Sequence, residues 1–150
     1  MADERLTDAR LARVSASFDG QPFMRLLGAS LTVLGYGRCR IALPWRADLT
    51  QQHGYVHAGV LGAIADTAAG YAVFTTLDDA DTQLITVGFT FNFVAPARGD
   101  SMVADAEVLK SGRTLSVCRM LVYAVRQMQQ TVIATGQQTL IRLPSAVRTP

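Results

Sequence analysis

The sequence contains only two cysteines, and their spacing matches no metal-binding or redox motif. Cys39 and Cys118 both lie within apolar stretches, and no C-x-x-C pattern occurs. Cysteines of this kind are typical of proteins from reducing compartments, where thiols stay unpaired. We therefore interpret both residues as buried free thiols.

Lysine is nearly absent, because Lys110 is the only one and arginine supplies the other basic residues. The net charge of +2 at pH 7 is too small to indicate a nucleic acid or an anionic membrane as a partner. Arginine suits the planar recognition of phosphate or carboxylate groups, but an arginine-rich genome would explain the same bias. The charge balance therefore names no partner.

Signals for secretion are also missing. The N-terminal stretch MADERLTDARLARV is charged and lacks the apolar core and cleavage site of a signal peptide, so we expect a cytoplasmic protein. Residues 58–77 have the length of a membrane span, but they are rich in Ala, Gly and Thr and carry Asp66 near their centre. A central charge is costly in a bilayer. We therefore interpret this run as a helix wrapped by protein.

The remaining elements follow from periodicity and turn residues. Residues 4–18 have a loose helical spacing with Thr7 and Asp8 as possible caps, and residues 21–27 follow as a helical turn. The long helix precedes an acidic loop at 78–81. Strands are predicted over 29–36, 38–44, 84–94, 102–109, 114–125 and 132–143, with turns at 35–37, 96–100 and 111–113. With no repeat or linker, we predict one domain over 1–150, with an N-terminal helical segment (1–28) and a flexible tail (144–150).

The order of these elements predicts an α+β fold. Short turns join the four strands after the long helix, so these strands should be antiparallel. A curved antiparallel sheet has one face to bury, and a helix that is apolar all round needs covering on every side. A sheet wrapped round the helix meets much of both needs, and a second copy of the sheet would complete the cover. The chain is therefore expected to form a dimer.

Three stretches keep the order and spacing of a known family: HGYVHAGVLGAIADTAAGYA, TVGFTFNFVAPARGD and EVLKSGRTLSV. Over roughly residues 45–142 the chain resembles the PaaI-like acyl-CoA thioesterases of the hotdog-fold superfamily. The resemblance implies a hotdog fold, homodimers that often pair into homotetramers, and active sites at the dimer interface. It also implies an acyl-CoA substrate, with no metal and no cofactor beyond the coenzyme A that the substrate carries.

Asp66 is the one carboxylate of the long helix. Apolar surroundings disfavour the charged form of a carboxylate, which would suit Asp66 to be a general base near neutral pH or a nucleophile. The resemblance implies that the acidic residue at this position is catalytic. The alternative is a structural aspartate bonded to a hydroxyl such as Thr67, or an interface charge. His57 lies nine positions earlier, on the opposite face and about 13 Å away along the axis, so a site using both needs two chains.

The helix begins at Ala58 and Gly59, whose N–H groups have no partner inside the helix. A thioester carbonyl placed there would have its developing negative charge stabilised. The resemblance gives this role to the position of Ala58, where relatives commonly have glycine and where Cβ adds bulk. His57 would either position the carbonyl or be satisfied by the backbone at the helix start. Small residues at 58 and 59 would also permit close packing.

Two further polar residues match family positions. Gln51 matches an amide that orients the attacking water, with Gln52 as its neighbour if the register shifts by one, and Thr86 matches a Ser or Thr near the reacting centre. The alternative for Gln51 is an ordinary surface loop residue, and the alternative for Thr86 is ordinary strand propensity.

His53 and His57 form an H-x-x-x-H pair, but the predicted loop places His53 outside the helix, and no third ligand is evident. We predict no metal site.

Coenzyme A carries phosphates, so basic side chains should gather at the mouth of the site. Arg98, Lys110 and Arg113 lie on two predicted turns, PARGD and LKSGRT, where Gly112 would allow close backbone approach. Solvated turn charges are the alternative. The pantetheine arm would run along the strand after the helix, by main-chain hydrogen bonds to Val87, Gly88 and Phe89. Aromatic side chains would line the core or the acyl pocket, namely those of Tyr71, Phe89, Phe91 and Phe93.

The sequence thus predicts an acyl-CoA thioesterase. Asp66 of one subunit would activate water or attack the thioester, and the amides of Ala58 and Gly59 of the other subunit would hold the oxygen, with Gln51 and His57 assisting. A hotdog hydratase or dehydratase using His57 and Asp66 is the alternative enzyme, distinguished by a shifted double bond in place of a free thiol. A non-catalytic acyl-CoA-binding protein is the third interpretation.

Overall fold

The computed structural model describes residues 6–79 and 81–144. The elements along the chain are α1 (Asp8–Asp19), α2 (Pro22–Leu27), β1 (Ser30–Gly35), β2 (Arg38–Pro44), the short 3-10 helix η1 (Ala47–Leu49), α3 (Ala58–Phe74), β3 (Gln83–Phe93), β4 (Ser101–Ser111), β5 (Leu115–Arg126) and β6 (Gln129–Leu143). The predicted helix at 4–18 begins at Asp8, with Thr7 as its N-cap. Most of the predicted C-terminal tail lies outside the described residues.

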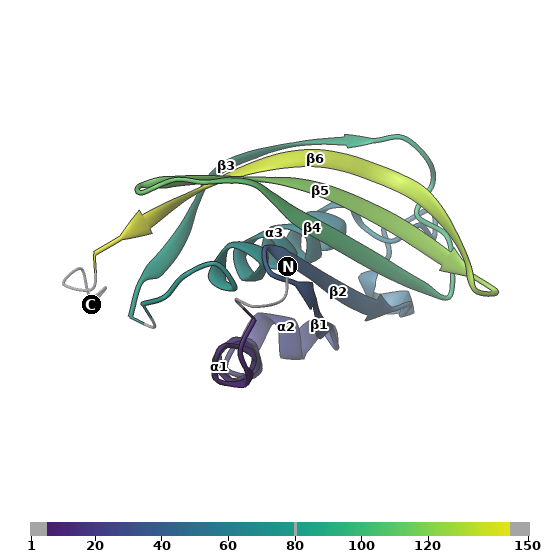
Figure 1. Ribbon diagram of the computed structural model, residues 1–150. Coiled ribbons are helices and arrows are strands. Elements are labelled where there is room, and N and C mark those ends of the chain that lie inside the picture. The colour runs from purple at the N-terminus through teal and green to yellow at the C-terminus, as the bar shows by residue number, and fades with distance from the viewer. Residues whose placement is uncertain (1–5, 80, 145–150) are drawn as a thin grey trace.

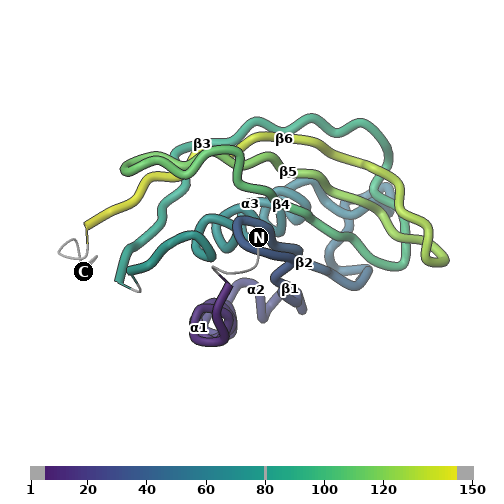
Figure 2. Tube along the Cα trace, viewed as in Figure 1, coloured from purple at the N-terminus to yellow at the C-terminus, as the bar shows by residue number. Residues whose placement is uncertain are grey.

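One six-stranded antiparallel sheet, in the order β1-β2-β4-β5-β6-β3, curves around α3. Figures 1 and 2 show the sheet arching over the helix, with α1 and α2 on the opposite side of α3 from β5 and β6. Strand direction and the central helix confirm the predicted α+β hotdog architecture. The helix is shorter than predicted, because its regular hydrogen bonding stops at Phe74.

The position of β3 differs from the prediction of strands joined by short turns. β3 pairs with β6 and not with β4. The PARGD stretch is therefore part of a link across the end of the sheet, not a hairpin turn. Backbone hydrogen bonds from Val94 to Ile133 and from Asp100 to Val125 hold this link against the two strands that it passes. Hairpins join β4 to β5 and β5 to β6. One edge of β6 then has no partner from these hairpins, and β3 pairs with that edge.

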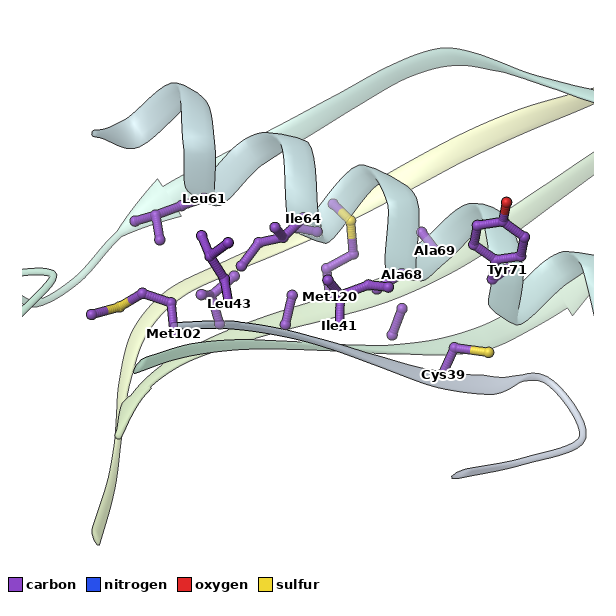
Figure 3. Close-up of a cluster of buried hydrophobic side chains, with 14 of the residues drawn as sticks. Cys39, Ile41, Leu43, Leu61, Ile64, Ala68, Ala69, Tyr71, Met102 and Met120 are labelled. Atoms are coloured by element: carbon purple, nitrogen blue, oxygen red, sulfur yellow. The ribbon is translucent and has the colours of Figure 1, made fainter. Parts of the chain in front are cut away.

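The core lies between α3 and the concave face of the sheet. In Figure 3 the α3 side chains Leu61, Ile64 and Ala68 face side chains of the sheet such as Leu43 and Met120. Alanines let the helix approach the sheet closely, because they add little volume at the contact. The α3 alanines that are fully buried are Ala65, Ala68, Ala69 and Ala72. The interpretation of residues 58–77 as a helix packed in protein is thus confirmed, and no helix among the described residues is long and apolar enough to cross a membrane.

The two cysteines are free and fully buried, as predicted. Burial raises the pKa of the Cys39 thiol to about 12, with a further contribution from nearby Cys118. Burial likewise raises the pKa of the Cys118 thiol to about 12. The thiolate is the reactive form of cysteine, so both side chains are inert packing groups in the folded chain.

Two arginines of α1 dock the N-terminal helices onto the end of α3. Arg10 donates hydrogen bonds to the backbone oxygens of Thr75 and Leu77 at 2.7 and 2.9 Å. Arg13 donates to Leu77 and Phe74 at 2.6 and 3.3 Å. The last carbonyls of a helix lack intrahelical partners and carry partial negative charge, so this contact is favourable. It fixes α1 and α2 beside the C-terminal half of α3.

The outer edge of β3 is bordered by exposed apolar side chains. Val87 is 61% exposed, Phe89 48% and Phe93 49%. No other described strand pairs with this edge. An unpaired, apolar edge strand offers its backbone groups to a strand of another chain. Within the described chain, β3 is therefore an edge strand with apolar side chains beside its open side.

Candidate active site

Asp66 lies on α3, half-buried, at the wall of a cavity of about 810 Å³. Four parts of the fold enclose this cavity: α3, the segment entering β3, one residue of β6, and the N-terminal helices that the arginines dock. From α3 the lining comprises Ala63, Asp66, Thr67, Gly70, Tyr71 and Phe74; residues 81–86 line it at the start of β3, Leu140 on β6, and Ser17, Gln21 and Phe23 on α1 and α2. The cavity is thus large enough for a small organic group next to the carboxylate.

Two donors converge on a single oxygen of Asp66. Thr86 Oγ donates to Oδ1 at 2.6 Å, and Gln138 Nε2 donates to the same atom at 2.8 Å. Gln138 Nε2 also lies 3.1 Å from Thr86 Oγ. Among the described residues no side chain donates to Oδ2, so the lone pairs of this oxygen remain available. The surroundings of Asp66 are therefore partly polar, because side chains from β3 and β6 both contact its carboxylate.

A bulge in β3 turns Thr86 toward Asp66. The pairing of β3 with β6 shifts between Thr86 and Gly88, which leaves Val87 without a partner on β6. An extra residue of this kind resets the alternation of side chains along a strand. In a regular strand, Thr86 and Phe89 would point to opposite faces of the sheet. The bulge lets both face α3, where the Phe89 ring lies against Gly62. The alternative for Thr86, strand propensity alone, does not account for its contact with Asp66.

Sequence reasoning missed Gln138. It lies on β6 directly opposite Cys118 of β5 and is fully buried. The available signal was the pair Gln137–Gln138 within an otherwise largely apolar strand. Side chains alternate along a strand, so one member of such a pair must face the core. Thr67 was predicted as an alternative hydrogen-bond partner of Asp66. It lines the cavity, and among the described residues its hydroxyl makes no hydrogen bond to Asp66.

His57 is the N-cap of α3. Its Nδ1 accepts a hydrogen bond from the Gly59 N–H at 2.8 Å, and its backbone oxygen accepts from Val60 and Leu61. The structure therefore favours the helix-start interpretation of His57. The Gly59 amide is already used, so only one of the two predicted oxygen-binding amides is available. That one is Ala58, whose N–H has no acceptor among the described residues.

Gln51 and His53 belong to a tight loop before α3. The Gln51 backbone N–H donates to Tyr55 at 2.9 Å, and the Gly54 N–H donates to Gln51 at 3.0 Å. The side-chain oxygen of Gln51 accepts from the His53 backbone N–H, while Gln52 is exposed. His53 is therefore outside the helix, as predicted. No three potential metal-binding side chains cluster within 6–79 and 81–144.

The residues before α3 and the residues around Asp66 form two separate groups. Gln51, His57 and Ala58 are absent from the described lining of the Asp66 cavity. Nine helical positions from His57 to Asp66 correspond to about 13 Å along the axis. One chain therefore does not bring these groups together, in agreement with the geometry expected from the sequence.

The predicted basic cluster does not form within one chain. Arg98 stacks on Tyr55, 4.4 Å from the ring centroid, in the link before β4. Lys110 and Arg113 lie at the opposite end of β4, at the hairpin with β5 (Figure 1). An 11-residue strand is about 35 Å long. Gly112 is also explained locally, because a Cβ there would lie 2.6 Å from the Leu115 carbonyl oxygen of the same turn.

A sheet wrapped round one long helix, with a carboxylate on that helix, defines the chain as a hotdog protein. The chain belongs to the Thioesterase superfamily, whose family model matches residues 53–130. A solved thioesterase family protein from Silicibacter pomeroyi is 41% identical, covers 89% of this chain and 98% of its own, and has a TM-score of 0.85.

Two other relatives extend the comparison. The PaaI protein from the phenylacetic acid degradation operon of E. coli is 23% identical, covers 93% of this chain and 96% of its own, and superposes with a TM-score of 0.80. A curated Halobacterium salinarum protein named "Putative esterase" is 28% identical over 137 residues, which are 87% of this chain and 90% of that protein. Membership of the superfamily supports thioester hydrolysis as the general class of activity.

Proposed function

We propose that the protein hydrolyses acyl-CoA thioesters to a free acid and coenzyme A. One observation carries the proposal: the Asp66 carboxylate is held by two donors on Oδ1, while Oδ2 is open beside a cavity. A carboxylate held in this way can take a proton from water or attack a carbonyl carbon. Family membership makes a thioester the substrate class that fits this site.

The proposed reaction uses water as the second substrate. In the general-base route, Asp66 Oδ2 accepts a proton while the water oxygen bonds to the thioester carbon. The C–S bond then breaks, and the sulfur leaves with the proton as the free thiol of coenzyme A. In the nucleophilic route, Oδ2 attacks the thioester carbon, the C–S bond breaks, and coenzyme A leaves as a thiolate while the acyl group forms an anhydride with Asp66. Water then hydrolyses the anhydride to the free acid and the Asp66 carboxylate, and the proton that water releases goes to the thiolate. In both routes the carbonyl oxygen gains negative charge, which a backbone N–H stabilises.

The donor for that oxygen is the Ala58 N–H of the partner subunit. Within one chain, the free N–H of Ala58 is too far along α3 to serve a substrate at Asp66. Pairing of two β3 edges would join two sheets and bring a second α3 alongside the first. Each interface would then contain Asp66 from one subunit and the start of α3 from the other. His57 holds that start in place, and Gln51 lies in the loop beside it.

The same pairing would unite the separated basic residues. Arg98 of one subunit and Lys110 and Arg113 of the other would face the phosphates of coenzyme A. Val87, Gly88 and Phe89 would flank the pantetheine arm along the joined edges. The acyl group would occupy the cavity beside Asp66, whose aromatic walls include Tyr71 and Phe74. Homotetramers would arise from a second contact between such dimers.

Assembly through β3 predicts that Val87→Lys yields monomers. Lysine on an edge strand opposes pairing with another chain, because its charge would have to be buried. Multi-angle light scattering after gel filtration should give at least twice the chain mass for the wild type and the single-chain mass for Val87→Lys. Met128→Lys is the matched control, since Met128 is 95% exposed at the β5–β6 hairpin. A Val87→Lys protein with wild-type mass would place the interface elsewhere.

The proposed activity is tested by thiol release from a panel of acyl- and aryl-CoAs. A colorimetric thiol reagent detects the product, and the protein's own buried thiols should remain unreactive while the chain is folded. Release of coenzyme A with equimolar free acid supports the thioesterase. A shifted double bond with the thioester intact would support the hydratase instead. Binding of acyl-CoA without either product would make the protein a binding module.

A further inference from the structure

The geometry points to Gln138 as a positioning residue that holds Asp66 as a carboxylate with Oδ2 directed to the substrate. This inference rests on the proposed function, because it assigns a role within the same site. Gln138 is not in the lining of the cavity, so it acts through Asp66 and does not touch the substrate.

The Gln138 amide has a single orientation that its neighbours permit. Its Nε2 lies within hydrogen-bond distance of Asp66 Oδ1, of Thr86 Oγ and, at 3.4 Å, of the Asp66 backbone oxygen. The reverse orientation would turn an oxygen acceptor toward a carboxylate, which can only accept. The amide is therefore fixed with its donor at Oδ1. Thr86 then accepts from Gln138 and donates to Asp66, so that each bond polarises the next.

Gln138 lowers the stability of the fold. Its Oε1 is buried and has no hydrogen-bond partner within the described chain. A buried acceptor without a partner lowers stability. A methionine of similar length would fill the same space on β6 with no unpaired polar atom. Packing alone thus disfavours glutamine here, and its contact with Asp66 supplies the reason for its presence.

Asp66 stands at the border of an apolar core, since Ala65 and Ala69, next to it on the turns of α3, are fully buried. Gln138 and Thr86 supply the hydrogen bonds that a carboxylate at such a border needs. The other titratable groups at the cavity are Tyr71 on α3 and Asp81 before β3, and Cys118 on β5 lies opposite Gln138. The described cavity lining contributed by α1, α2 and β6 contains no charged side chain.

The test replaces Gln138 by methionine, which keeps the length and removes the donor. Gln138→Met should lower kcat about tenfold by loosening Asp66, with KM within about twofold of the wild type. The acid limb of the pH–rate profile should move to higher pH, because the carboxylate loses a hydrogen bond that stabilises it. The matched control is Gln137→Met, one residue along on the exposed face of β6, which should leave both kcat and the acid limb unchanged.

A second readout needs no substrate. The carboxyl carbon of Asp66 is followed by NMR through a pH titration of the wild type and of Gln138→Met, and the midpoint should be higher in the variant. If Gln138→Met does not fold, Gln138→Leu replaces it, because leucine also removes the donor and adds no charge beside Asp66. An unchanged midpoint in the folded variant overturns the inference. A wild type that releases no thiol overturns the proposed function instead, so the two failures are distinguishable.

Discussion

Asp66→Asn should abolish thioester hydrolysis while leaving the fold intact. The asparagine oxygen can still accept the hydrogen bonds from Thr86 and Gln138, so the polar network and the packing of α3 survive. An amide nitrogen replaces Oδ2, and it can neither accept a proton nor attack a carbonyl carbon. We expect kcat for thiol release to fall by about 100- to 10,000-fold, the usual contribution of such a group. The measurement is steady-state release of coenzyme A.

The control for this substitution is Asp19→Asn. Asp19 is an exposed carboxylate at the end of α1, so the same change of charge occurs away from the cavity. Its kcat should equal that of the wild type. An Asp66→Asn enzyme within threefold of the wild type would make Asp66 a structural residue and remove the basis of the proposed mechanism.

Ala58→Pro should produce the second large loss of activity. Proline lacks the backbone N–H, so the substitution deletes the proposed oxygen donor and nothing else of the backbone. The first position of a helix is where proline is best tolerated. The preceding residue, His57, already has the extended conformation that proline requires, with φ −63° and ψ 136°. Loss of one such donor should lower kcat by about 100- to 1,000-fold.

Ala58→Pro changes two things at once, because it adds bulk to the side chain and removes the backbone N–H. Ala58→Val adds a comparable number of carbon atoms and keeps the N–H, so it is the matched control. We expect Ala58→Val to change KM more than kcat, because the added methyl groups meet the bound substrate in both ground and transition states. Equal losses of kcat in Ala58→Pro and Ala58→Val would show that space, and not hydrogen bonding, matters at the start of α3.

Local patterns predicted the features of the fold that local physics determines. The apolar run around Asp66 specified a helix packed against protein, although one of its faces is only partly buried and lines the cavity. Alternation along 84–94 placed the phenylalanines on one face, where Phe89 and Phe91 contact edge to face with centroids 6.2 Å apart. The pairing of β3 with β6 could not be read in this way. It depends on which strand edge remains free after β4, β5 and β6 have formed their hairpins, and no residue in β3 encodes that.

In the candidate site, too, local features could be predicted from the sequence and long-range contacts could not. Asp66 was evident because a charge in an apolar helix needs an explanation. Gln138 was not evident, because its contact with Asp66 joins residues 72 positions apart, and a glutamine in a strand is ordinary. The capping of Gly59 by His57 depends on a ring orientation that spacing does not give. The basic residues at 98, 110 and 113 lie at opposite ends of β4 within one chain, so the sequence could group them only through the phosphates of the expected substrate.

The most direct test of the two-chain site is a mixing experiment with the two inactive variants. Asp66→Asn and Ala58→Pro chains are unfolded, mixed in equal amounts and refolded together, with each refolded alone as the control. In a mixed dimer one site carries both defects and the other carries neither. Random pairing should therefore restore about a quarter of the wild-type activity. Activity no greater than the average of the two variants alone, with mixed dimers confirmed by mass spectrometry, would contradict an active site shared between subunits.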